Sequence, residues 1–412
     1  MRPSRVLLCV LVLVAALLPA RAQREGFVSA RGKQIVKPDG TALELRGVNL
    51  GNWLVPEGYM FGFDSATSPR LIEGVFNELV GPEEAGAFWT AFRRAYITRE
   101  DIRFIRDLGL NSVRVPFNWR LFTSPTDTSV WQGPGWALID SVVAWAGEAG
   151  LWVVLDMHCA PGGQTGDNID DSWGYPFLFD SPGEQRRTIE LWRRIALRHR
   201  DNPTVIGYDL LNEPIPHFVD TLRLNPLLEP LYRRIVAAIR EVDPHHLIFL
   251  GGGQWDTNFS VFGPPFDRAL VYTFHRYWCD TTQAMVEEYV AFRDRYDVPI
   301  WMGESGENTD AWIAAFRRLL ERNSIGWCFW PYKKLDSPRG VVTFDRPAGW
   351  EKIVAYADAP RSSYATIRAL RPPVGEVRAA LEEFVRLCRF QKVRVNRSYV
   401  EALSCRVPDA GK

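Results

Sequence analysis

The sequence predicts an α/β fold, specifically a (β/α)8 TIM barrel with extended βα loops. Short runs rich in β-branched and aromatic residues alternate with longer segments of helical period, which is typical of parallel βα units. Eight such runs occur, the number that closes a TIM barrel. The length of 412 residues also lies within the range of a barrel that carries long loops.

The eight predicted strands are apolar runs bounded by glycine, proline or polar residues. They cover residues 44–50, 111–117, 152–158, 205–212, 246–251, 270–277, 299–304 and 324–330. No repeat of fixed period, low-complexity tract or Gly/Ser linker separates them. We therefore expect one barrel domain over residues 23–375, and a C-terminal helix and tail packed on the barrel over residues 376–412.

The predicted helices carry recognisable start and stop signals. Ser181, followed by proline and then by Glu184, predicts an N-cap with a capping-box glutamate, and Asn202 with the next proline predicts the end of that helix. Thr98 and Asp101 open another helix in the same way. These segments fit the outer ring of a barrel.

The first 22 residues predict a secretory signal peptide. Arg2 and Arg5 precede an apolar run over residues 6–18, and Ala20 and Ala22 provide a small-x-small cleavage site. We expect a secreted, extracellular protein, or a periplasmic one in a bacterium. A retained signal anchor is the alternative, although the run is shorter than a membrane span requires.

The overall charge excludes several classes of partner. The chain has 49 basic and 49 acidic residues, so no strong attraction to nucleic acid or to an anionic membrane is expected. We expect no membrane span once the signal peptide is removed, and a monomer. The 16 tryptophans fit carbohydrate binding, because sugar rings stack on indoles, but large buried tryptophans would account for them equally.

Cysteine and histidine patterns give no sign of a metal or cofactor. No Cys-x-x-Cys pair and no His-Glu-x-x-His motif occur, so neither a metal nor a cofactor is expected. Cys9 lies in the predicted leader. Cys388 and Cys405 flank a polar stretch and are candidates for a disulfide in an oxidising compartment.

Polar side chains gather where the predicted strands end, which is where TIM barrels carry their functional residues. Two carboxylic acids, Glu213 and Glu304, arrive at this rim from the fourth and seventh strands. The other polar or aromatic residues at strand ends are Arg114, His158, Asn212, His275, Tyr277 and Trp330. The two acids are the minimum apparatus for glycoside hydrolysis, in which one protonates the departing oxygen and the other attacks the anomeric carbon.

The neighbours can give the two acids different roles. Arg114 would keep one carboxylate ionised, and that charge would raise the pKa of the other and keep it protonated. We assign Glu304 as nucleophile and Glu213 as acid/base, and we expect Asn212 to bond the sugar 2-OH. Tyr277 can donate a hydrogen bond to the nucleophile, while His275 can equally be a structural histidine.

Several motifs resemble glycoside hydrolase family 5 of the cellulase superfamily, over about residues 44–335. They are Ser-Val-Arg-Val-Pro-Phe at 112–117, Asp-Met-His at 156–158, Leu-Asn-Glu-Pro at 211–214, His-Arg-Tyr at 275–277 and Gly-Glu-Ser at 303–305. The resemblance implies that Glu213 is the acid/base and Glu304 the nucleophile of a retaining β-glycosidase acting on a β-linked glucan or oligosaccharide. It also implies that the six other strand-end residues complete the active site.

Within that family the segment from Arg46 to Glu57, and the loop from His158 to Gln164, resemble exo-β-1,3-glucanases. By this resemblance Glu57 binds a hydroxyl of the terminal sugar. The insert at 167–179 departs from the pattern of that group, so an endo-β-1,4-glucanase, or a hydrolase of another β-glycan or of a glycolipid, remains an alternative. A barrel that binds glycans without cleaving them is a remote one, because both acids are present.

Two further expectations concern aromatic side chains. Proline follows Trp330, so the Trp330–Pro331 peptide bond is predicted to be cis and the indole to face the sugar. Trp173 and Tyr175, in the insert, would either stack on substrate or anchor their loop.

Overall fold

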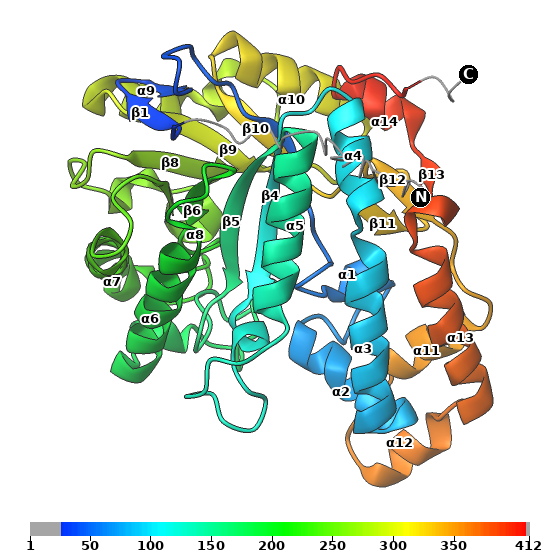
Figure 1. The fold of residues 1–412 in the computed structure, drawn as a ribbon. Helices are drawn as coiled ribbons and strands as arrows, with labels where there is room; N and C mark the ends of the chain where they lie inside the picture. The colour runs from blue at the N-terminus through cyan, green and yellow to red at the C-terminus, as the bar shows by residue number, and fades with distance from the viewer. Residues whose placement is uncertain (1–25, 409–412) are drawn as a thin grey trace, which may run out of the picture.

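The computed structural model describes residues 26–408 and shows a closed barrel of eight parallel strands in the order β10-β3-β4-β5-β6-β7-β8-β9 (Figure 1). The barrel strands are β3 (Arg46–Asn49), β4 (Ser112–Asn118), β5 (Trp152–Cys159), β6 (Val205–Asp209), β7 (Leu247–Gly251), β8 (Leu270–His275), β9 (Ile300–Glu304) and β10 (Gly326–Phe329). The predicted fold class is therefore confirmed. The predicted signal peptide lies outside the described residues.

All eight predicted strands are present, but two of them end two or three residues earlier than predicted. β6 pairs with its neighbours only as far as Asp209, and β8 only as far as His275. Glu213 has a φ of 48°, and Trp278 a φ of 50°. Past these ladders the backbone still bonds to neighbouring strands, because the Asn212 N–H donates to the Met157 carbonyl at 3.2 Å and the Arg276 N–H to the Glu304 carbonyl at 3.3 Å. The left-handed residues Glu213 and Trp278 cannot continue a strand, so the chain turns away from the sheet there.

Helices surround the barrel; the longer ones cover its outside, whereas the short α1 and α8 lie in loops at its carboxyl end. They are α1 (Gly58–Phe61), α2 (Pro69–Val80), α3 (Pro82–Tyr96), α4 (Arg99–Asp107), α5 (Gly135–Ala149), α6 (Pro182–His199), α7 (Thr221–Arg240), α8 (Gly253–Asp256), α9 (Glu287–Tyr296), α10 (Asp310–Arg322), α11 (Trp350–Ala357), α12 (Tyr364–Leu370), α13 (Val374–Leu387) and α14 (Arg397–Ala402). Thr98 and Asp101 form the predicted capping box of α4, and the Ser181 side chain accepts from the backbone of Glu184 at the start of α6. Between β7 and β8, only the short α8 and the 3-10 turn η3 (Phe259–Val261) occur.

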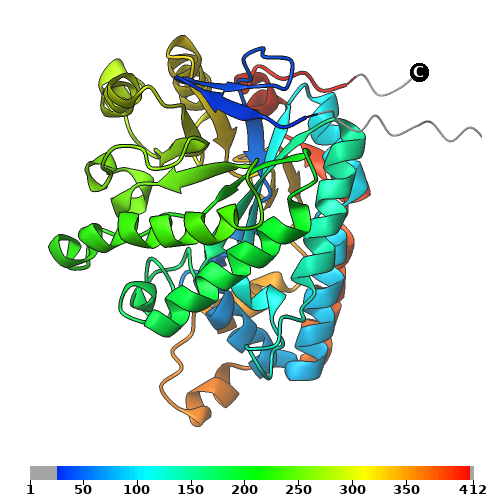
Figure 2. The ribbon, with the colours of Figure 1, turned by 60° about the vertical axis from the view of Figure 1, so that its left-hand side comes forward.

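The helices near the start of the chain pack against α13, near its end. Figures 1 and 2 show α3 and α13 side by side. An aromatic cluster fills the space between α1, α2, α3, α11 and α13, and its members include Phe61, Phe76, Trp89, Trp350 and Phe384. The C-terminal segment also supplies β13 (Arg394–Val395), which pairs with β12 (Val342–Phe344) beside β11 (Lys333–Leu335).

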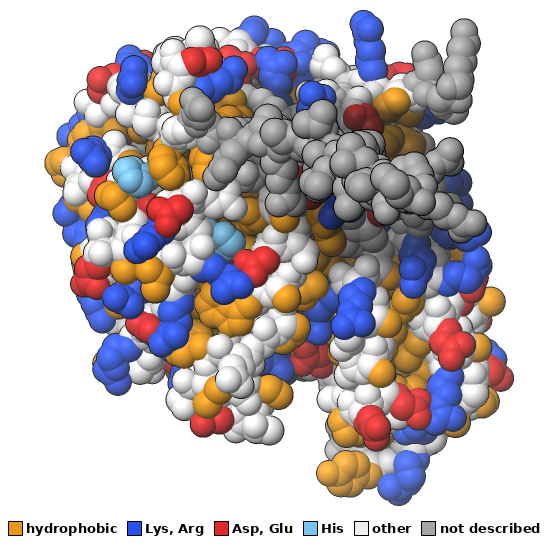
Figure 3. Space-filling view, viewed as in Figure 1, with side chains coloured by type: hydrophobic (Ala, Val, Ile, Leu, Met, Phe, Trp, Pro, Cys, Tyr) orange, Lys and Arg blue, Asp and Glu red, His pale blue; other side chains and the backbone are white. Residues whose placement is uncertain are grey.

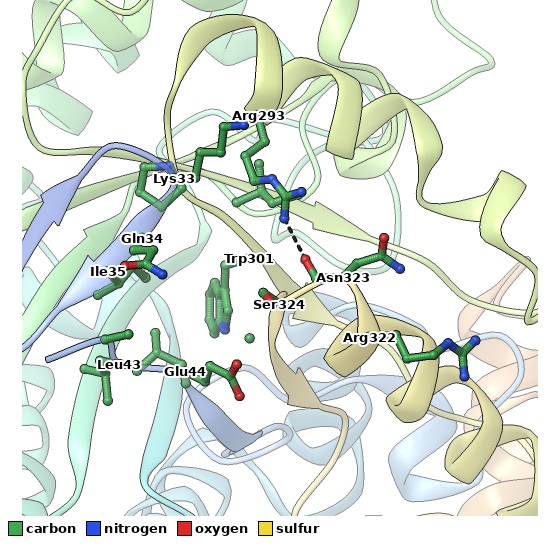
Figure 4. Close-up of a pocket in the computed structure, with 15 residues that line it drawn as sticks. Lys33, Gln34, Ile35, Leu43, Glu44, Arg293, Trp301, Arg322, Asn323 and Ser324 are labelled. Atoms are coloured by element: carbon green, nitrogen blue, oxygen red, sulfur yellow. Dashed lines mark hydrogen bonds between the residues drawn. The ribbon is translucent and has the colours of Figure 1, made fainter.

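The hairpin of β1 (Ser29–Arg31) and β2 (Gln34–Val36) covers the end of the barrel at which the amino ends of the strands lie. Beneath it a cavity of about 390 Å³ surrounds the buried Trp301, with Lys33, Arg293 and Glu44 at its edge (Figure 4). This cavity lies at the amino ends of β9 and β10 and contains none of the predicted site residues.

Three further predictions concern the surface charge, membrane spans and the cysteines. Figure 3 shows positive and negative side chains interspersed over one face, as the balanced composition predicts. Within residues 26–408, no helix is both long and apolar enough to cross a membrane. The predicted Cys388–Cys405 disulfide is wrong: both are buried free thiols, and their sulfurs bond to the backbone carbonyls of Val385 and Leu403.

Candidate active site

The carboxyl ends of the barrel strands surround a cavity of about 800 Å³. Of the predicted site residues, seven line it: Glu57, His158, Glu213, His275, Tyr277, Glu304 and Trp330. The other two, Arg114 and Asn212, are fully buried and bond to these residues or to one another. The structure thus brings together all nine residues that the sequence singled out.

Arg114 is the centre of a buried network in β4. Its Nε donates to Asp209 at 2.8 Å, one terminal nitrogen lies 3.1 Å from Asp156, and the guanidinium also bonds to Glu304. It donates to the Asn212 side chain at 2.9 Å as well. Burial raises the pKa values of Asp156 and Asp209 to about 7, although the Arg114 charge opposes the rise. One cation thus faces several carboxylates and holds them in fixed positions.

Glu304 stands at the end of β9, where both carboxylate oxygens are held. One oxygen accepts from Arg114, and the other accepts from the Tyr277 hydroxyl at 3.0 Å. Burial raises the pKa of Glu304, while the positive charge of Arg114 and the hydrogen bond from Tyr277 oppose that rise. Two hydrogen-bond donors therefore favour the ionised form of this acid.

Glu213 lies four residues beyond the end of β6, in a turn held by the loop that follows β5. The Thr165 hydroxyl donates to the Glu213 carbonyl at 2.8 Å, and the Ile215 N–H donates to the Gln164 carbonyl at 3.0 Å. The Glu213 carboxyl lies 2.8 Å from His275 Nδ1. Burial raises the pKa of Glu213 well above its usual range, and the charges of Glu304 and Glu57 raise it further.

The two acids are close together. A carboxyl oxygen of Glu213, one of Glu304 and a ring nitrogen of His275 all lie within 4.8 Å of one another. Retaining glycosidases hold their two carboxyl groups about 5 Å apart, whereas inverting ones leave room for a water at about 6.5–9.5 Å. Among the described residues, Glu213 pairs with the His275 imidazole and with no lysine or arginine, whereas Glu304 pairs with Arg114. The pair can therefore hold a proton on Glu213 and a charge on Glu304.

His275 is held between two carboxyl groups. Its Nε2 lies 3.5 Å from Asp256, a buried residue that also accepts from the Glu213 backbone N–H at 3.2 Å. Burial lowers the pKa of His275 well below its usual range and raises that of Asp256 well above. His275 Nε2 and Asp256 Oδ1 have no hydrogen-bond partner among the described residues, so the hydrogen bond that holds the His275 ring is the one between Nδ1 and Glu213.

Aromatic side chains form one wall of the cavity. The Trp330 indole lies nearly parallel to the His158 ring, with centroids 5.5 Å apart, and donates to the Tyr59 hydroxyl at 2.6 Å. The Trp330–Pro331 bond is cis, as predicted. His158 Nδ1 in turn bonds to Asp156 at 2.8 Å, and burial lowers the pKa of His158 to about 3, so the imidazole is neutral.

A charged wall, formed by Glu57, Glu307 and Lys334, follows the ends of β3, β9 and β10. Lys334 Nζ lies 2.7 Å from both carboxylate oxygens of Glu307 and 4.5 Å above the Tyr59 ring. Glu57 is buried, and its Oε1 has no hydrogen-bond partner among the described residues. Burial raises the pKa of Glu57 well above its usual range, and Glu304 adds to the rise. This wall can bind sugar hydroxyls.

The insert at 167–179 anchors itself through its aromatic residues. Trp173 is 74% exposed and lies under the Arg70 guanidinium, and Tyr175 donates to Asp180 at 2.7 Å. Neither is among the described residues that line the cavity, and their contacts fit the second of the two predicted roles, that of a loop anchor. Residues 167–169 do line the cavity.

Several residues of the cavity and its network were missed by the sequence reasoning. They are Tyr59, Asp156, Asp209, Trp255, Asp256, Trp278, Glu307 and Lys334. For Asp156 a signal existed, because residues two apart on a strand share a face and His158 was already a candidate. Lys334 and Trp255 follow strand ends by several residues, and no local pattern marks them.

The carboxylates and imidazoles of the site form two groups whose spacing suits a metal ion. They are Asp156 with His158 and Glu304, and Glu213 with His275 and Glu304. Each His Nδ1 already bonds to a carboxyl oxygen of its own group. The donor sets are thus accounted for by hydrogen bonds within the site.

A closed (β/α)8 barrel with two such acids at its carboxyl end defines a glycoside hydrolase. Comparison with known proteins makes the class more specific. The family model described as cellulase, glycosyl hydrolase family 5, matches residues 78–336. The chain belongs to this family.

Its relatives act on different β-glycosides, as their names state. A "Beta-xylosidase" from Phanerodontia chrysosporium is 30% identical over 357 residues, covering 78% of this chain and 73% of its own. A "Probable glucan 1,3-beta-glucosidase A" from Aspergillus fumigatus is 32% identical over 217 residues, covering 52% of this chain and 51% of its own. The crystal structure of an endogalactoceramidase, 19% identical, superposes with a TM-score of 0.61 over 92% of this chain and 84% of its own, which shows the shared fold.

Proposed function

We propose that this protein is a secreted, retaining exo-β-glycosidase that releases a terminal sugar from β-glucans or related β-glucosides. The observation that carries the proposal is the spacing of Glu213 and Glu304, with carboxyl oxygens within 4.8 Å, and their unequal partners. This spacing suits double displacement. The predicted signal peptide supports secretion.

In the first step, Glu304 attacks the anomeric carbon while Glu213 gives its proton to the departing oxygen. The glycosidic bond breaks, and a sugar ester of Glu304 forms. In the second step, Glu213 takes a proton from water, the resulting hydroxide displaces Glu304 from the anomeric carbon, and both acids return to their starting states. Arg114 and Tyr277 orient the Glu304 carboxylate, and Asn212 would bond the sugar 2-OH.

The charged wall favours exo action over the endo-acting alternative. Glu57 lies buried in the cavity with its Oε1 unpaired among the described residues, and a sugar hydroxyl would supply the missing partner. A similar role for Glu57 is implied by the resemblance to exo-β-1,3-glucanases. Substrate and mode of action are tested by offering laminarin, barley β-glucan, carboxymethylcellulose, mannan and glucosylceramide in parallel. The substrates that are cleaved identify the linkage. The lengths of the products identify the mode of action: release of single sugars supports exo action, and release of longer oligomers contradicts it.

The mechanism is tested with two variants and an activated aryl β-glucoside. Glu304→Gln removes the nucleophile and is expected to abolish turnover. Glu213→Ala removes the acid/base, and added azide is expected to restore turnover and yield a β-glycosyl azide, identified by NMR. Wild-type rates in Glu304→Gln, or an α-configured azide product, would contradict double displacement.

Secretion is tested by sequencing the N-terminus of the exported protein, which is expected near Gln23.

A further inference from the structure

Two adjacent lysines of β11 point in opposite directions. Lys334 faces the cavity, where its Nζ lies 2.7 Å from both carboxylate oxygens of Glu307 and 4.5 Å above the Tyr59 ring. Lys333 faces away from the cavity, and its ammonium group is fully buried among α3, α4 and the end of α13. Neighbouring residues of a strand point to opposite sides, so the position of one lysine is set together with that of the other.

The Lys333 ammonium group has a partner for each of its three hydrogens. Its Nζ lies 2.7 Å from Asp101 Oδ1, and it donates to the carbonyls of Tyr96 at 2.5 Å and of Cys388 at 2.9 Å. The Tyr96 hydroxyl donates in return to the Lys333 carbonyl at 2.6 Å. Asp101 belongs to the capping box of α4, Tyr96 ends α3, and Cys388 follows α13. One side chain thus joins β11 to three helices.

Lys334 lies beyond the barrel strands, so its position depends on contacts outside the barrel. The Tyr332 N–H still donates to the Asn49 carbonyl of β3 at 2.9 Å, which ties the segment to the barrel at that residue. From Lys333 onward, β11 belongs to a separate sheet with the short strands β12 and β13. The buried contacts of Lys333 therefore anchor β11 where the barrel register no longer does.

The buried charge of Lys333 needs a reason beyond stability. An ammonium group loses its hydration on burial, and replacing a buried ion pair by apolar side chains of similar volume is often neutral for stability. Position is such a reason. We propose that Lys333 is a positioning residue, which holds β11 against α3, α4 and α13 and thereby keeps Lys334 in the charged wall. This inference rests on the proposed function, in which the charged wall binds the terminal sugar.

A displaced Lys334 would change the wall in two ways. Glu307 would lose its counter-ion. Burial raises the pKa of Glu57, and the Lys334 charge, which opposes that rise, would be lost as well. Both changes weaken the binding of sugar hydroxyls, whereas the two catalytic acids keep their own partners. We therefore expect KM to rise and kcat to change little.

The test is a double-mutant cycle with an aryl β-glucoside. Lys333→Met, Lys334→Met and their combination are compared with the wild type. Rates are expressed per active site, counted with an aryl 2-deoxy-2-fluoro-β-glucoside that leaves its sugar as an ester on Glu304. We expect Lys333→Met to raise KM about three- to tenfold, to keep kcat within about twofold, and to add no further rise when Lys334 is already replaced. A residue that serves stability alone would lower the count of active sites and leave KM unchanged.

A second variant guards against unfolding. Lys333→Met leaves Asp101 buried without its cation, and an uncompensated buried charge is strongly destabilising. Lys333→Met/Asp101→Asn carries neither charge and keeps an acceptor for the Thr98 N–H, and it is expected to show the same rise in KM. Lys352→Met is the matched control: this lysine also pairs with a residue of α13, Glu376, but the pair is about half exposed, so KM is expected to stay unchanged.

Two outcomes would overturn the inference. One is a wild-type KM per active site in both Lys333→Met and Lys333→Met/Asp101→Asn. The other is a pair of KM effects that multiply in the combined Lys333→Met/Lys334→Met variant, because Lys333 would then not act through Lys334. Failure of the proposed function would look different, since the wild type would form no ester on Glu304 and would cleave the aryl β-glucoside no faster than Glu304→Gln.

Discussion

Replacing Tyr277 with phenylalanine tests whether the hydroxyl group holds the nucleophile. The hydroxyl donates to Glu304 at 3.0 Å, and the substitution removes this bond without changing the ring. A hydrogen bond to a charged group is worth about 1.5–3 kcal/mol. If the bond is needed to orient the attacking oxygen, kcat/KM for an aryl β-glucoside falls about 10- to 150-fold.

The same variant changes the pH dependence in a defined direction. Burial raises the pKa of Glu304, the Arg114 charge lowers it, and the hydrogen bond from Tyr277 lowers it further. Loss of that bond therefore raises the pKa. Because Glu304 must be ionised to attack, the acidic limb of the kcat/KM profile is expected to move to higher pH, while the basic limb, which reports protonated Glu213, stays in place.

The matched control is Tyr208→Phe. Tyr208 is also buried, and it donates to Asp243 at 2.7 Å, but it lies outside the cavity. This variant is expected to lose stability and keep the kcat/KM profile. If Tyr277→Phe retains both the rate and the acidic limb of the wild type, the hydroxyl does not orient the nucleophile and our account of Glu304 is refuted.

Two further sites give predictions of stability and rate. Asp256→Asn keeps an oxygen that can accept from the Glu213 N–H and is neutral, as burial makes Asp256, so kcat/KM is expected to change less than about threefold. Asp256→Ala leaves that buried N–H unpaired and is expected to cost about 1–3 kcal/mol in urea unfolding. A large loss of activity in the Asn variant would show that Asp256 acts as an anion. Gly51→Ala would place a methyl group 2.6 Å from the Trp330 ring, so we expect kcat/KM to fall and stability to drop by about 1–3 kcal/mol. Gly74→Ala, with open space around it in α2, is the control and is expected to stabilise by about 0.5–1 kcal/mol; equal thermal shifts for the two would contradict the packing argument.

The parts of the site that lie within strands could be predicted from sequence. Arg114 and Glu304 belong to β4 and β9, so the barrel register alone places them at the rim. Strand alternation could likewise have indicated Asp156. Residues beyond the strand ends were harder: Glu213 was predicted as the end of a strand, yet its position depends on hydrogen bonds from a different loop.

Residues held by distant contacts could not be predicted. Trp255 is positioned by a left-handed turn that depends on Gln254 reaching Ile215 and Asn258. Lys334 forms its ion pair with Glu307 because the two residues follow β10 and β9, which are neighbours in the barrel. The pairing of Cys388 with Cys405 could not be judged from the sequence either. A disulfide requires a specific distance and orientation of the two residues, and the fold sets both.

The packing of α13 on α2 and α3 has a consequence for synthesis of the chain. About 290 residues separate the end of α3 from the end of α13. At roughly 5–20 residues per second, the ribosome takes about 15 to 60 s to make that stretch. Throughout this interval the rings of Phe88 and Phe92 lack their partner Phe384, so the nascent chain exposes an aromatic surface until its last helices emerge.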